Sequence, residues 1–186
     1  MPLIFIAGGV RSGKSQFAEQ MAARYCQAQR FIYLASGVAL DQEMQQRILR
    51  HQADRQAQPI HWHTVEAPSA IADALAECKA GDIVLWDCVT TWLANIFYEG
   101  FDDGTPCFAQ PGCLDNKLAQ VKQAIEALLA QDIVLLVVSN ELFDEPPYAS
   151  HEVELYRQTL GQCHQWFVAT AQEAYEIHYG IAKRWK

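Results

Sequence analysis

The first twenty residues contain the feature that most constrains the fold. Residues 3–7 read LIFIA, a continuous apolar run that is typical of a strand buried on both faces of a parallel sheet. Residues 8–15 follow as GGVRSGKS and fit the pattern G-x-x-x-x-G-K-[ST] at every fixed position. A helical pattern of apolar residues comes next, between Phe17 and Ala22. A strand, this glycine-rich turn and a helix in succession predict a phosphate-binding P-loop.

The chemistry of this turn comes from its backbone and from two side chains. Glycines let successive N–H groups point inward, and the turn opens onto a helix N-terminus that carries roughly half a positive charge. Lys14 is expected to reach the outer phosphates of a nucleotide as a mobile cation, and the Ser15 hydroxyl is expected to bind Mg²⁺. A chance match to the motif is disfavoured by the strand before it and the helix after it.

Further apolar runs alternate with helical patterns along the chain. They predict strands at 31–35, 62–65, 83–86, 133–138 and 175–179, the last with one solvated face near the sheet's edge. Helices are predicted at 41–55, 68–78, 90–97, 118–129 and 151–173, with a long loop at 98–116. No linker interrupts the pattern, so residues 1–186 are expected to form a single domain. The alternation predicts an α/β fold with a mainly parallel sheet, helices on both faces and ligands at the strands' carboxyl ends.

A second signal lies at the end of one of these strands. Residues 83–87 read IVLWD, the apolar run followed by an acid that is typical of a Walker B strand. The carboxylate of such a strand holds the water shell of Mg²⁺ near the P-loop, so Ser15 and Asp87 are the predicted metal ligands. Many buried strands end in an aspartate that only caps a helix, but a P-loop in the same domain favours the metal role.

A third signal is the triplet Arg47, His51 and Arg55, whose spacing of four residues places it on one helix face. Near a triphosphate, the two guanidiniums could clamp phosphate oxygens and keep the imidazole neutral by disfavouring its cationic form. A neutral imidazole could attack the α-phosphorus of a nucleoside triphosphate, expel pyrophosphate and hold the nucleotidyl group through a P–N bond. From spacing alone, a solvated helix face in which His51 has no chemical role is the favoured alternative.

Composition limits the partners and the compartment. The net charge of −8 argues against a nucleic-acid or anionic-membrane partner, because both require basic surfaces. No basic leader precedes the first apolar run and no apolar segment has transmembrane length, which predicts a cytoplasmic location without a membrane span. We expect all six cysteines to be reduced thiols, with one disulfide under oxidising conditions as the alternative; Cys107 and Cys113 are the closest in sequence.

Several linked motifs resemble the bifunctional adenosylcobinamide kinase and adenosylcobinamide-phosphate guanylyltransferase family of cobalamin biosynthesis. They are GGVRSGKS at 8–15, YLAS at 33–36, RILRHQADR at 47–55, WHTVE at 62–66, DCVTT at 87–91 and SNE at 139–141. A P-loop followed by R-x-x-x-H-x-x-x-R is far more selective than a P-loop alone. The chain departs from the family pattern at 142–147 and at His164, where asparagine is usual.

The resemblance implies a RecA-like P-loop NTPase fold, a homotrimer, and ATP and GTP as substrates together with a corrinoid, adenosylcobinamide. It implies that the P-loop, with Lys14 as a catalytic residue, serves phosphorylation of the aminopropanol hydroxyl, and that a guanylylated His51 then transfers GMP from GTP onto the new phosphate. Arg47 is expected near the triphosphate from its spacing. The resemblance implies further nucleotide contacts at Gly8, Gly9, Val10, Arg11, Ser12, Gly13, Lys14, Ser15, Leu34, Ala35, Ser36, Gln52, Ala53, Asp54, Arg55, Glu66 and Asp87.

Two other functions are compatible with the sequence. A P-loop small-molecule kinase would transfer the γ-phosphate without a covalent nucleotidyl intermediate, and His51 would be incidental. A nucleotide-sensing protein would bind nucleotide without turnover, and the departure from the family pattern at 142–147 suggests this alternative.

Overall fold

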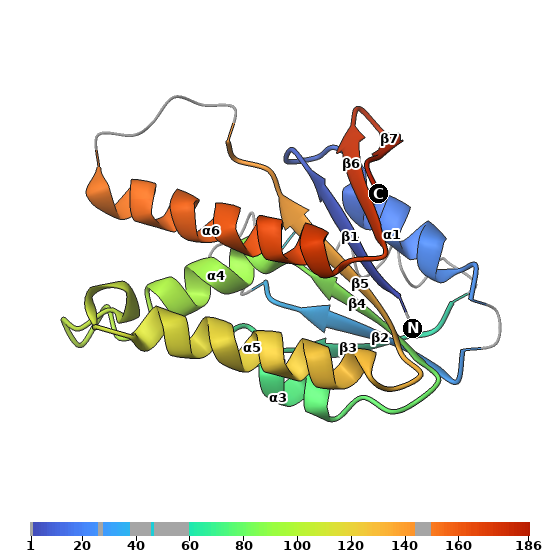
Figure 1. Ribbon diagram of the computed structural model, residues 1–186, viewed down its shortest axis with the longest axis horizontal. Helices are drawn as coiled ribbons and strands as arrows, with labels where there is room; N and C mark the ends of the chain where they lie inside the picture. Colours follow the sequence, from blue (N-terminus) through green and yellow to red (C-terminus); the bar gives the residue numbers. More distant parts are fainter. Residues whose placement is uncertain (1, 26–27, 38–45, 47–59, 144–149) are drawn as a thin grey trace.

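The computed structural model describes residues 2–25, 28–37, 46, 60–143 and 150–186, which form a seven-stranded sheet with the order β3-β2-β4-β5-β1-β6-β7 (Figure 1). The strands are β1 (Leu3–Gly8), β2 (Arg30–Ala35), β3 (Trp62–Glu66), β4 (Asp82–Asp87), β5 (Val134–Asn140), β6 (Glu173–His178) and β7 (Ile181–Arg184). Neighbouring strands are parallel except β6 and β7, which are antiparallel. The predicted α/β fold with a mainly parallel sheet is confirmed.

The strand order separates the two motif strands by one other strand. β5 lies between β1, which leads into the P-loop, and β4, which ends at Asp87. This is the arrangement of a RecA-like P-loop NTPase fold. The three strands are central, so both of their faces are covered, and this explains why their sequences are continuously apolar.

Helices cover both faces of the sheet, as expected (Figure 1). One face packs against four helices through a core that includes Phe5, Trp86, Ile125 and Phe167. Within the part of the chain that the structure describes, the other face packs against helix α1 through Ala18, Met21 and Ala22. The helices are α1 (Lys14–Ala22), α3 (Ile71–Ala76), α4 (Val89–Phe97), α5 (Cys113–Leu129) and α6 (His151–Thr170), with a short 3₁₀ helix η1 (Cys107–Ala109).

The predicted loop at 98–116 was too long. Helix α5 begins at Cys113, five residues before its first predicted residue. The prediction missed this opening turn because the turn is polar and exposes Asp115 and Asn116. An acidic residue in a first helical turn is stabilised by the helix dipole, so Asp115 fits this position. The remaining loop also contains η1. The apolar periodicity of the sequence indicated neither η1 nor the first turn of α5.

The expectation that every cysteine is a free thiol was wrong for one pair. Cys107 and Cys113 form a disulfide with a Cα–Cα distance of 5.4 Å, which links η1 to the start of α5. Cys78, Cys88 and Cys163 are free and buried. Cys26 lies outside the described residues.

The C-terminal segment also differs from the prediction. The strand expected at 175–179 is β6, but it begins at Glu173, ends at His178 and lies one strand inside the sheet. The edge is formed by β7, whose short polar sequence gave no strand signal. Tyr179 lies in the turn between them and not on the sheet. Within the described residues, no helix combines the length and apolar character needed to cross a bilayer.

Candidate functional site

The P-loop is a closed turn between β1 and α1. The Ser12 amide donates to the Gly9 carbonyl at 3.2 Å, and the Phe17 amide donates to the Gly13 carbonyl at 3.0 Å, which starts the helix. Arg11 and Gly13 have positive φ angles of 60° and 94°, so the chain turns sharply just before α1. Successive backbone amides in such a turn form an anion-binding concavity at the helix N-terminus.

Lys14 is held inside this turn. Its side chain is only 6% exposed, and its Nζ donates a hydrogen bond to the Gly9 carbonyl at 2.9 Å. A buried ammonium needs an anionic or dipolar partner, because transfer from water to a less polar environment disfavours the charge. A phosphate group is a better partner than a carbonyl, so Lys14 is poised to exchange one for the other when a nucleotide binds.

The predicted strand-end residues lie along one edge of the sheet. Gly8 is level with Asn140, Ala35 is level with Asp87, and Glu66 is level with Ala35. Asp87 is level with Val138, two residues before Asn140, so Asp87 and Glu66 lie about two residues short of Gly8 along the strands. With neighbouring strands about 4.8 Å apart and a rise of about 3.3 Å per residue, Asp87 lies about 12 Å from Gly8 and Glu66 about 20 Å. Asp87 can therefore share a metal–phosphate complex with the P-loop, whereas Glu66 can reach only a more distant part of a ligand.

Asp87 is half-buried and oriented by a neighbour. The hydroxyl of Tyr33 donates a hydrogen bond to Asp87 Oδ2 at 2.7 Å. The peptide bond between Asp87 and Cys88 is cis. Burial, together with the Asp87 charge, raises the pKa of the Cys88 thiol, while the nearby Lys14 charge lowers it. Lys14, at the start of α1, and Asp87, at the end of β4, thus both act on the Cys88 thiol and lie near the same small region.

The donor set suits Mg²⁺ bound together with a nucleotide. Ser15 and Asp87 offer a hydroxyl and a carboxylate oxygen, the hard ligands that Mg²⁺ prefers. Among the described residues, no group of three or more His, Cys, Asp or Glu side chains could hold a metal. Mg²⁺ commonly takes one or two protein ligands, with phosphates and waters supplying the others, so this sparse set fits the ion.

Two buried polar atoms at this site have no hydrogen-bond partner within the described part of the chain. They are the Ser12 Oγ, in the P-loop, and the Asn140 Oδ1, at the end of the adjacent strand. Buried polar atoms are nearly always paired, so two unpaired ones beside a phosphate-binding turn indicate that a ligand or its water shell completes them.

A polar network that the sequence did not reveal supports Asn140. Its backbone amide donates to Thr90 Oγ1 at 2.7 Å, and this hydroxyl lies 3.0 Å from Ser139 Oγ. Ser139 Oγ is in turn 2.7 Å from His164 Nε2 on α6. The sequence analysis names Asn140 only as part of the motif SNE at 139–141. The motif DCVTT contains Thr90 and the motif SNE contains Ser139, but nothing in the spacing indicated that their hydroxyls meet.

The remaining predicted residues fall into three groups. Leu34 and Ser36 are fully buried, and Ser36 Oγ accepts a hydrogen bond from Trp86 Nε1 at 2.8 Å, so both side chains serve the packing of this edge. Val10 and Arg11 are exposed on the P-loop, and Glu66 is exposed on β3. Arg47, His51, Gln52, Ala53, Asp54 and Arg55 lie outside the described residues, as does the predicted helix at 41–55 apart from Gln46.

Comparison with known proteins gives one consistent result. The model of a family described as cobinamide kinase / cobinamide phosphate guanyltransferase matches residues 4–184. A relative from Escherichia coli (strain K12), the bifunctional adenosylcobalamin biosynthesis protein CobU, is 30% identical over 190 residues, covering 99% of each chain. A Pseudomonas aeruginosa relative, the bifunctional adenosylcobalamin biosynthesis protein CobP, is 47% identical over 92 residues, covering 49% of this chain and 50% of the relative.

Among solved structures, a similar fold occurs in the ATP synthase subunit NeqB from Nanoarcheaum equitans. The TM-score is 0.53 with 14% sequence identity, and the match covers 94% of this chain and 45% of that one. At this identity the likeness concerns the fold alone.

Substitution by alanine at the first two glycines of the P-loop should change the stability of the fold by very different amounts. A Cβ at Gly8 would lie 2.5 Å from the Ile177 carbonyl oxygen on β6 and 2.8 Å from Ser12 Oγ, whereas a Cβ at Gly9 would meet nothing within 4 Å. We expect Gly8→Ala to lower the free energy of unfolding by about 2 kcal/mol, because the backbone must move. Gly9→Ala, the matched control, should change it by less than about 0.5 kcal/mol in urea denaturation without nucleotide. Equal effects would contradict the close packing of β6 on the loop.

The buried ring of His164 predicts a pH dependence of stability. Burial lowers the pKa of His164 from 6.5 to about 4, so the folded protein holds the ring neutral. The unfolded chain takes up the proton first as pH falls. The free energy of unfolding that depends on His164 is therefore highest above pH 6.5. It falls by about 3 kcal/mol as the pH is lowered from 6.5 to 4.

The matched variant is His164→Asn, which keeps a polar side chain beside Ser139 but cannot titrate. The wild type should lose more unfolding free energy than this variant between pH 6.5 and 4, measured by urea denaturation at several pH values. Parallel curves for the two proteins would contradict a neutral, buried His164.

Proposed function

Because the chain belongs to the cobinamide kinase / cobinamide phosphate guanyltransferase family, we propose that it phosphorylates adenosylcobinamide and then transfers GMP from GTP onto the product through His51, giving adenosylcobinamide-GDP. Family membership identifies it as an enzyme, a bifunctional kinase and guanylyltransferase of cobalamin biosynthesis. The proposal adds the roles of individual residues. The observation that supports it best is a P-loop with a buried Lys14 beside two unpaired buried polar atoms, Ser12 Oγ and Asn140 Oδ1.

In the kinase step, the P-loop binds the phosphates of ATP or GTP. Its backbone amides and the Lys14 ammonium neutralise charge on the phosphate oxygens, and this charge grows as the terminal P–O bond breaks. The aminopropanol hydroxyl of adenosylcobinamide attacks the γ-phosphorus and loses its proton, and the nucleoside diphosphate leaves. Unlike a side chain on a mobile loop, Lys14 is already held in the turn, so little reorganisation is needed.

Magnesium belongs to the same proposal. Ser15 and Asp87 are the proposed protein ligands, and the Tyr33 hydroxyl holds the Asp87 carboxylate in place through its hydrogen bond. When bound, the ion would neutralise phosphate charge. The hydrogen bond from Tyr33 leaves Asp87 Oδ1 and the remaining lone pair of Oδ2 available to the ion or to its waters.

In the second step, a nitrogen of the His51 imidazole attacks the α-phosphorus of GTP and expels pyrophosphate, forming a P–N bond. A phosphate oxygen of adenosylcobinamide phosphate then attacks the same phosphorus and breaks the P–N bond. Arg47 and Arg55 are proposed to hold phosphate oxygens on either side of the imidazole. The remaining predicted nucleotide contacts, from Gln52 to Asp54 and at Glu66, stay part of this proposal.

Assembly and location are also proposals. A single domain over residues 1–186 is proposed from the unbroken alternation of elements, and a homotrimer from the resemblance; a cytoplasmic location is proposed with them. The same composition argues against a nucleic-acid partner, because the net charge is −8.

The guanylylation step predicts a labelling pattern. Incubation with GTP labelled at the α-phosphate should give an acid-labile protein adduct, because P–N bonds hydrolyse in acid. GTP labelled at the γ-phosphate should leave the protein unlabelled. His51→Ala should abolish the adduct, whereas His61→Ala, which removes an exposed histidine on the approach to β3, should label like the wild type. Undiminished labelling of His51→Ala would exclude His51 as the nucleophile.

The kinase step predicts the effect of removing the buried cation. Lys14→Ala should lower the rate of phosphate transfer from ATP to adenosylcobinamide by roughly 10²- to 10³-fold, because a preorganised charge at the transferring group is lost. Lys79→Ala, which removes an exposed lysine, is the control. Phosphorylation at the wild-type rate by Lys14→Ala would contradict the P-loop as the kinase site.

A further inference from the structure

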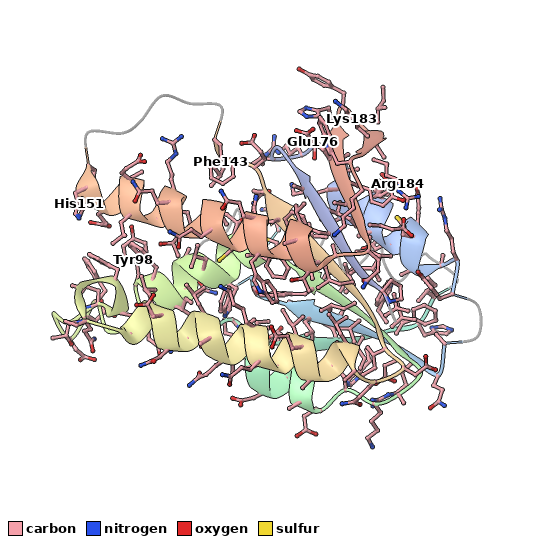
Figure 2. The ribbon with its side chains drawn as sticks, in the orientation of Figure 1. Tyr98, Phe143, His151, Glu176, Lys183 and Arg184 are labelled. Carbon is pink, nitrogen blue, oxygen red and sulfur yellow. A yellow bond between two sulfur atoms is a disulfide. The ribbon has the colours of Figure 1, made fainter. Side chains whose placement is uncertain are left out.

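The hairpin formed by β6 and β7 is docked on the P-loop. In its turn, the Gly180 amide donates a hydrogen bond to the Ser12 carbonyl at 2.9 Å. Two P-loop glycines face the same hairpin, since a Cβ at Gly13 would lie 3.5 Å from Gly180 Cα and a Cβ at Gly8 would clash with the Ile177 carbonyl. The turn is therefore fixed relative to the phosphate-binding backbone. Glu176 on β6 and Lys183 on β7 lie opposite each other in the register of this hairpin (Figure 2).

Tyr179 is the residue that this turn presents to solvent. It is 97% exposed, more than any other large hydrophobic residue that the structure describes. Its φ angle of 49° lies in the left-handed region, which non-glycine residues rarely adopt. With the residues that the structure describes, Tyr179 shares no hydrogen bond or ring contact, so its side chain contributes little to the fold. Tyr179 and Gly180 both have positive φ angles, as a two-residue hairpin turn requires, so the turn itself explains this backbone conformation. What points to a role in binding is the exposed aromatic ring held next to the P-loop by the contact from Gly180 to Ser12.

We propose that the Tyr179 ring is the stacking platform for the purine base of the nucleotide whose phosphates occupy the P-loop. This inference rests on the nucleotide-binding role of that loop in the proposed function. Tyr179 is bonded directly to Gly180, so its Cα lies about 3.8 Å from the residue that touches Ser12. A base is joined to its phosphates through one ribose, so a platform about one side-chain length from the loop is at a suitable distance.

The neighbours of Tyr179 favour a neutral, flat ligand group over a second phosphate. His178 forms an ion pair with Glu176 at 2.8 Å, and Glu176 also accepts a hydrogen bond from Trp185 Nε1 at 2.9 Å. The polar groups of His178, Glu176 and Trp185 are therefore already paired with one another. Two further exposed apolar side chains, Val10 on the P-loop and Ile181 after the turn, adjoin the same junction in the sequence. An exposed aromatic ring binds a purine by its face, which tolerates both adenine and guanine.

The test compares ligands with and without a base. The full chain is titrated calorimetrically with GTP, with ATP and with inorganic triphosphate, for the wild type, Tyr179→Gly and Tyr179→Phe. Glycine suits the left-handed backbone, so Tyr179→Gly should fold at least as well as the wild type. Its affinity for GTP and ATP should fall about tenfold, its affinity for triphosphate should not change, and Tyr179→Phe should stay within about twofold of the wild type. Phe101→Ala, which removes another exposed aromatic residue, is the control.

Four other results of these measurements would each exclude a specific claim. If Tyr179→Gly keeps the wild-type affinity for both nucleotides, Tyr179 is not the platform, while the P-loop proposal stands. If GTP, ATP and triphosphate all weaken together, the turn acts by shaping the loop and not by stacking. If sedimentation shows that Tyr179→Gly changes the oligomeric state, the ring is a contact between copies of the chain. A wild type that binds neither triphosphate nor nucleotide would refute the underlying function itself.

Discussion

The structure depends on the close approach of three backbone segments at the carboxyl end of β1. Gly8 leaves room for the Ile177 carbonyl on β6, the Glu141 amide donates to the Gly8 carbonyl at 2.9 Å, and Gly180 is bonded to Ser12. A side chain at Gly8 would push these segments apart. Because they fix the turn from both neighbouring strands, its amides are oriented before any ligand arrives, which lowers the cost of binding.

This preorganisation explains how an acidic protein can bind a polyanion. With a net charge of −8, long-range attraction cannot concentrate a triphosphate at the surface. The favourable terms must be local: aligned amides, a helix N-terminus and one buried ammonium with a replaceable partner, the Gly9 carbonyl. The edge of the sheet then adds Asn140 on the adjacent strand and Asp87 one strand farther from the turn, each held by a neighbouring hydroxyl, from Thr90 and Tyr33 respectively.

The sequence predicted the parts of this site that depend on contiguous residues. The P-loop, the strand that ends at Asp87 and the order of elements all follow from local patterns, because a buried central strand must be apolar throughout and a phosphate turn must contain glycines. The network from Thr90 through Ser139 to His164 joins three separate elements, and no local pattern encodes such a meeting. The β6–β7 hairpin was missed for a related reason. β7 is a short, polar edge strand stabilised by its pairing with β6, and its own residues carry no strand signal.

When a nucleotide binds, Lys14 is expected to exchange the Gly9 carbonyl for a phosphate while the surrounding backbone stays in place. A crystal structure of the full chain with Mg²⁺ and a non-hydrolysable GTP analogue tests it directly. We expect Lys14 Nζ within hydrogen-bond distance of a phosphate oxygen and no longer hydrogen-bonded to Gly9, with the hydrogen bond from Gly180 to Ser12 intact. A nucleotide bound elsewhere, with Lys14 still on the Gly9 carbonyl, would contradict it.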